Sequence, residues 1–177
     1  MKPTHQGIVA VSKRNLASYL SAFDLDHFMK GFEHDFDKRL EVQKAIYLLQ
    51  ESGADLGYHF SWYLRGPYSP TLADDAYSLL GVQMTRFLTE TEPIPQDVMQ
   101  KFPNLMRIVK RKSGTPKEES RWLEILSSVH FVMKHSYPRP RTEDEGIDYI
   151  ARLKGNRFSK PEIEESYEIL RKIGFLK

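Results

Sequence analysis

The sequence contains no cysteine, which excludes disulfide bonds, thiolate zinc sites and cysteine nucleophiles. No apolar run approaches the ~20 residues that a membrane-spanning helix needs. Residues 1–11 lack the apolar core of a secretory signal, so we expect a cytoplasmic protein with no membrane partner. Net charge is only +2, from 26 basic and 24 acidic residues, whereas duplex-DNA binders usually carry a larger basic excess. Only local clusters of cations therefore bear on nucleic-acid binding.

The chain has the size and composition of one globular domain. Its 177 residues are 40% hydrophobic and 28% charged, enough to build a sizeable core. The linkers 112–117 and 138–141 are short, which favours a single domain over residues 13–177 after a loose start at residues 1–12. We expect a mainly α fold with a short β-hairpin or small sheet, forming a single compact helical domain. One arrangement compatible with such a domain is winged-helix-like.

Several segments have the periodicity of amphipathic helices. Val42, Ala45, Ile46 and Leu49 fall on one face of a helix expected over 37–52, with Asp37 as its cap. Further helices are expected at 14–32 (broken near Asp24), 70–80, 95–112, 118–135 and two segments after 142. The last two begin with the capping-box patterns Thr142…Glu145 and Ser159…Glu162.

One short segment has the period of a strand instead. Tyr58, Phe60, Trp62 and Leu64 alternate with more polar neighbours, as in a half-buried strand. Its backbone needs a partner, for which we expect residues 84–90 or a piece near the N-terminus. Residues 65–70 (Arg-Gly-Pro-Tyr-Ser-Pro) should then end the strand in a rigid turn and cap the next helix with Ser69. That helix is expected to present Asp74, Asp75 and Ser78.

The turn at residues 65–69 has two interpretations. The free amides of the following helix N-terminus, with Arg65 beside them, would favour an anionic partner. Alternatively, Gly66 and Pro67 serve only geometry, Ser69 only capping and Tyr68 only packing. The residues themselves leave both open.

A resemblance to known proteins rests on three stretches. They are Gln43-Lys44-Ala45-Ile46-Tyr47-Leu48-Leu49, then Tyr58 to Ser69 with Leu72 and Asp75, and finally Arg157 to Glu162 with Ile163, Leu170 and Gly174-Phe175-Leu176. Together these resemble the YwgA-like proteins, which are akin to the Panacea (SocA-like) antitoxin domain. The helix from Trp122 to Met133 is similar to the helix that these proteins have between the second and the third of these stretches. Residues 81–115 depart from the pattern and residues 1–35 look like an extension.

The resemblance implies a small, mostly helical domain that neutralises a toxin or serves as an adaptor, for example in phage defence. We therefore expect a protein-binding module, not an enzyme, whose partner is another protein such as a toxin. Aromatic and arginine side chains are typical of interface hot spots. The expected partner-binding residues are Gln43, Lys44, Trp62, Arg65, Gly66, Pro67, Tyr68, Ser69 and Asp75.

The alternative is a nucleic-acid-binding protein of winged-helix-like form. The basic cluster near residues 101–117 supports it, since Arg107, Lys110 and Arg111 share a helical face and Lys112 follows. Such a patch would bind phosphates without sequence preference and in a salt-sensitive way. A solvated helix end, where cations interact favourably with the helix dipole, explains the same residues.

No metal, cofactor or catalytic residue is expected. His130 and His135 are five residues apart, off the i, i+4 spacing that places two ligands on one helical face. The carboxylate pairs Asp74-Asp75 and Glu164-Glu165 point apart in a helix, which is unsuitable for acid–base work. The sequence shows no nucleophile elbow and no phosphate-binding glycine loop.

Overall fold

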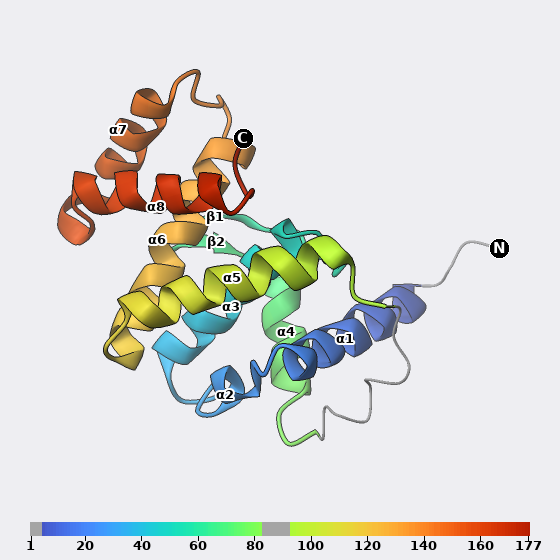
Figure 1. Ribbon diagram of the computed structural model, residues 1–177. Helices are drawn as coiled ribbons and strands as arrows, with labels where there is room; N and C mark the ends of the chain where they lie inside the picture. Colours follow the sequence, from blue (N-terminus) through green and yellow to red (C-terminus); the bar gives the residue numbers. More distant parts are fainter. Residues whose placement is uncertain (1–4, 83–92) are drawn as a thin grey trace.

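The computed structural model describes the backbone of residues 5–82 and 93–177 and the side chains of residues 13–82 and 93–177. These residues form eight α-helices, one 3₁₀ turn and a two-stranded antiparallel sheet (Figure 1), which confirms the mainly α expectation. The elements are α1 (His5–Ala22), α2 (Asp26–Met29), α3 (Phe36–Glu51), β1 (Ser61–Tyr63), β2 (Gly66–Tyr68), α4 (Pro70–Ser78), α5 (Gln96–Lys112), α6 (Pro116–His135), α7 (Glu143–Lys154), η2 (Gly155–Arg157) and α8 (Lys160–Lys172). Helix α1 begins inside the range expected to be loose, and that expectation stays a prediction.

Helices α3 and α6 form the centre of the molecule and pack on each other more extensively than any other described pair. Every residue of α3 from Leu40 to Leu49 is buried, and so is every residue of α6 from Leu123 to Val132. A helix buried on all sides has no face for its polar residues to reach water, so each of them needs an internal partner. The polar side chains of these two helices therefore define the sites described below.

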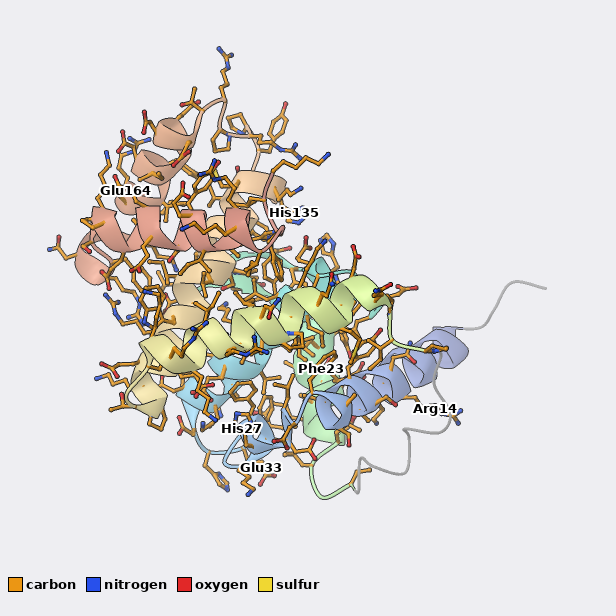
Figure 2. All side chains as sticks on the ribbon, viewed as in Figure 1. Arg14, Phe23, His27, Glu33, His135 and Glu164 are labelled. Carbon is orange, nitrogen blue, oxygen red and sulfur yellow. The ribbon has the colours of Figure 1, made fainter. Side chains whose placement is uncertain are left out.

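The other helices surround this pair. Helices α7 and α8 pack on α6 at one end of the molecule, and α1, α2 and α4 lie at the other end (Figure 1). Helix α5 crosses between the two groups and contacts both α3 and α6. Phe23, just after α1 and labelled in Figure 2, meets Phe102 of α5 edge to face. Their ring centroids are 5.3 Å apart. Within the described residues no helix has both the length and the apolar character of a membrane span.

The strand expectation was partly wrong. Residues 65–69 were expected to be a turn, but Gly66–Tyr68 is itself a strand that pairs with Ser61–Tyr63 across a tight hairpin at Leu64 and Arg65. Gly66 permits this because its φ of +96° lies in the region that glycine adopts readily. Residues 84–90, the expected pairing strand, lie outside the described residues.

The helix ends confirm some capping expectations and correct others. Ser69 caps α4, and Ser159 with Glu162 forms a complete capping box at α8. Helix α3 is capped by Asp35, whose carboxylate accepts from the amide of Asp37, so Asp37 is not the cap. Thr142 caps α7, but the Glu145 carboxylate accepts from the amide of Arg141, so this capping box is incomplete.

Candidate functional site: an aromatic groove beside a buried ion network

The hairpin is held by two buried polar side chains of α3. The Gln43 amide donates to the carbonyl of Ser69 and accepts from its N–H, both at 2.9 Å. Lys44, only 1% exposed, donates from Nζ to the carbonyl of Pro67 at 2.5 Å. Because α3 is buried on all sides, these backbone groups are the internal partners that the two side chains need. The hairpin is thereby fixed rigidly to α3, one of the two central helices.

The position of Lys44 is unfavourable for its charged form. Burial lowers the pKa of Lys44 to about 7, and nearby Lys154 and Arg65 act in the same direction while Glu124 opposes them. The unfolded chain, with the ordinary Lys pKa of 10.5, binds more protons than the folded chain between pH 7 and pH 10.5. Stability contributed by this group therefore rises with pH through that window.

A pH titration of stability tests this assignment. Between pH 7 and pH 9 the free energy of unfolding of the wild type should rise by about 2 kcal/mol more than that of Lys44→Met. Lys154, whose pKa burial also lowers, contributes with the same sign to both proteins, so most of the difference reports on Lys44. Urea denaturation at several pH values provides the measurement. Parallel pH profiles for the two proteins would show that burial does not lower the pKa of Lys44.

Behind the hairpin lies a buried ion network centred on Glu124 of α6, which is 0% exposed. Its carboxylate accepts from Nζ of Lys154 at 3.0 Å, from Nε and a terminal nitrogen of Arg157 at 2.9 and 2.7 Å, and from Nε of Arg65 at 2.8 Å. Burial acts to raise the pKa of Glu124, but the bonds from Arg157, Lys154 and Arg65 outweigh burial and lower the pKa. Three cationic side chains therefore share this carboxylate.

An apolar cavity of about 500 Å³ opens on the outer side of the hairpin. We call it the aromatic groove. Its lining includes Phe32, Phe36, Arg39, Gln43, Lys44, Tyr63, Leu64, Arg65, Gly66, Tyr68 and Tyr77. The Phe36 ring lies near two guanidinium groups, 6.0 Å from that of Arg39 and 5.7 Å from that of Arg65. The groove therefore combines aromatic walls with cations.

Large apolar side chains gather unusually at this groove. Among the described residues, eight such side chains are exposed, and Phe36 (54%), Tyr63 (52%), Leu64 (90%) and Tyr77 (44%) all line the groove. The other four, Met99, Tyr137, Tyr149 and Leu153, do not. Single exposed apolar residues are ordinary, whereas a cluster around one cavity is typical of an interaction site.

The expected partner-binding residues divide into exposed and buried sets. Trp62, Arg65 and Tyr68 are partly exposed, and Arg65 and Tyr68 line the groove. Buried instead are Gln43, Lys44, Gly66, Pro67, Ser69 and Asp75. The expectation that α4 presents Asp75 was wrong, because this carboxylate is 5% exposed and accepts from the Tyr58 hydroxyl at 2.9 Å. The six buried residues support the hairpin from inside the fold.

The groove residues that lie away from the hairpin were not among the expected partner-binding residues. Phe36 and Arg39 come from the start of α3 and Tyr77 from the end of α4, on either side of the expected site. Their apolar or cationic character gave no signal, since either type is common on helix surfaces. Glu124, Lys154 and Arg157 were also missed, because only the fold brings α6, α7 and η2 together.

The basic cluster of the alternative hypothesis lies on α5. Arg107, Lys110 and Arg111 are exposed, and Arg107 donates to the side chain of Asn104 at 3.0 Å. Lys112 is less available, because it pairs with Glu165 and lies 4.7 Å from the Trp122 ring. Three cations therefore remain on an open helix face, a modest patch for phosphate binding.

No protein-family model, curated protein or solved structure matches the chain. The resemblance to YwgA-like and Panacea-like proteins stays a prediction, and function is inferred from the geometry of the groove.

Proposed function

We propose that the chain is a non-enzymatic protein-binding module, of the antitoxin or adaptor type that its resemblance to Panacea-like proteins implies. The aromatic groove is the proposed partner surface. The convergence of four exposed apolar side chains on one cavity carries this proposal. Aromatic and arginine side chains around an apolar cavity are the composition that interface hot spots favour.

The chemistry of the groove defines the partner segment. A cavity of about 500 Å³ accommodates bulky apolar side chains rather than a flat surface. Arg39 and Arg65 add cationic character, and Arg65 is already in contact with the buried network through Glu124. A segment that carries aromatic or aliphatic residues with a neighbouring carboxylate complements both features. We therefore propose an apolar, acidic segment of another protein as the ligand.

Selection from a random peptide display library tests the proposal without a known partner. Enriched peptides should combine a large apolar residue with Asp or Glu. Their affinity, measured by fluorescence polarisation, should fall at least about tenfold for Leu64→Ser and for Tyr77→Ser, a loss of about 1.4 kcal/mol or more. Both residues are exposed, so the substitutions should leave the fold intact, which circular dichroism checks.

Matched controls come from the same exposed class. Met99→Ser and Leu153→Ser alter large apolar side chains that do not line the groove, and they should leave peptide affinity unchanged. Selection of no peptide, or equal affinity across groove and control variants, would refute the proposed surface. Salt-sensitive oligonucleotide binding that is lost when Arg107, Lys110 and Arg111 become Gln would instead favour the nucleic-acid alternative.

A further inference from the structure

A second cluster of polar groups lies between the two central helices, away from the groove. Tyr47 and Glu51 are one turn apart on α3, and they face His130 and His135 of α6. The sequence spacing of the two histidines argued against a metal site. The spacing concerns a single helix, whereas the third candidate ligand, Glu51, comes from the facing helix α3.

The three candidate ligand atoms lie close together. Oε2 of Glu51 is 3.1 Å from Nε2 of His135 and 3.9 Å from Nδ1 of His130, and all three atoms lie within 4.8 Å of one another. Two donors bound to one tetrahedral Zn²⁺ at about 2.0–2.1 Å are roughly 3.4 Å apart. Small rotations of the partly exposed Glu51 and His135 side chains therefore suffice to bring all three atoms to one ion.

The surroundings of His130 resemble those of an oriented ligand. Its imidazole is 1% exposed and meets the Phe175 ring edge to face at 5.8 Å, a contact that holds the ring in place. The Tyr47 hydroxyl contacts Nδ1 at 2.7 Å. A metal ion at Nδ1 would take the place of this hydroxyl, so the Tyr47 side chain would have to turn aside when the ion binds.

The opposite side of the cluster is open. Glu51 is 21% and His135 43% exposed, and Figure 2 places His135 at the outer end of α6. Both residues line a cavity of about 330 Å³ that also contacts Tyr47 and His59. A site with three protein ligands and one side facing a cavity leaves a coordination position for water or a small ligand.

We propose that Glu51, His130 and His135 form a binding site for a divalent transition-metal ion of the Zn²⁺ type. Two imidazoles and a carboxylate suit Zn²⁺ and its probe Co²⁺, whereas Mg²⁺ and Ca²⁺ prefer all-oxygen ligands. The site shares no residue with the aromatic groove, so it stands or falls independently of peptide binding.

The test uses the full chain without an affinity tag, first treated with a chelator. Calorimetric titration with Zn²⁺ should show saturable binding of one ion per chain, and Co²⁺ should give visible absorption bands of a low-symmetry site. Glu51→Gln and His135→Ala should each weaken binding at least about tenfold. Zn²⁺ should also raise the melting temperature of the wild type and not of these variants.

The matched control is His34→Ala, which removes the histidine of an exposed pair with Glu33, 3.7 Å apart and without a second imidazole. Its metal affinity should equal that of the wild type. Both ligand variants alter partly exposed side chains, so the test does not depend on a variant of buried His130. No saturable uptake by the wild type, or equal affinity in Glu51→Gln, His135→Ala and His34→Ala, overturns the proposal.

Discussion

Glu124→Gln is expected to lower the free energy of unfolding by about 3–5 kcal/mol. The substitution keeps the shape of the side chain but removes the one negative charge that Lys154, Arg157 and Arg65 share. The Lys154 side chain is only 1% exposed, so water cannot replace the lost carboxylate. Removing one partner of a buried ion pair costs far more stability than the intact pair contributes, because the remaining charge stays buried without a partner. Urea denaturation followed by tryptophan fluorescence measures the change.

Two further variants show whether the stranded charge is the cause. Glu165→Gln removes a half-exposed carboxylate that pairs with Lys112, and it should cost less than about 1 kcal/mol. Lys154→Met added to Glu124→Gln should recover part of the lost stability, since the uncompensated cation is then gone. Equal losses for Glu124→Gln and Glu165→Gln, or no recovery in the double variant, would contradict the ion-network interpretation.

Gly66→Ala is the second substitution with a large expected effect, a loss of about 3 kcal/mol in the free energy of unfolding. Two costs combine. The backbone φ of +96° is strained for any residue with a Cβ atom, and that Cβ would lie 2.6 Å from Oγ of Ser128. Helix α3 holds the hairpin through Gln43 and Lys44, so the chain at Gly66 cannot move away easily.

The two costs can be separated by denaturation of three variants. Gly57→Ala, at a φ of +72° with no described atom within 4 Å of the added Cβ, should show the backbone cost alone, about 1 kcal/mol. Ser128→Ala should cost little by itself, because its buried Oγ has no hydrogen-bond partner among residues 13–82 and 93–177. Combined with Gly66→Ala, it should recover the steric part. A Gly66→Ala loss no greater than that of Gly57→Ala would show that the hairpin yields to the added atom.

The sequence predicted features that depend on neighbouring residues. The break at Asp24, the caps Ser69 and Ser159, and the helix at 118–135 all follow from periodicity and local hydrogen bonding. The strand at Gly66–Tyr68 was missed because Gly66 and Pro67 are residue types typical of turns. The strand is only three residues long, too short to show an alternating pattern.

The candidate sites depend on partners far apart in the chain. Gln43 meets Ser69 across 26 residues, Arg65 meets Glu124 across 59, and Tyr47 meets His130 across 83. No local pattern encodes such pairs. The burial on all sides of Leu40–Leu49 and Leu123–Val132 was also not evident, because buried polar residues such as Lys44 and Glu124 make each helix look amphipathic in sequence.

The excess of cations around Glu124 has a kinetic consequence for any ligand of the aromatic groove. Lys154, Arg157 and Arg65 already outnumber the single carboxylate, and Arg65 belongs to both the network and the groove. Arg39 and Arg65 line the groove, and their positive charges should accelerate the diffusional encounter with acidic segments and slow the encounter with basic ones. Association rates should accordingly fall as ionic strength rises, while dissociation, governed by the aromatic contacts, changes little.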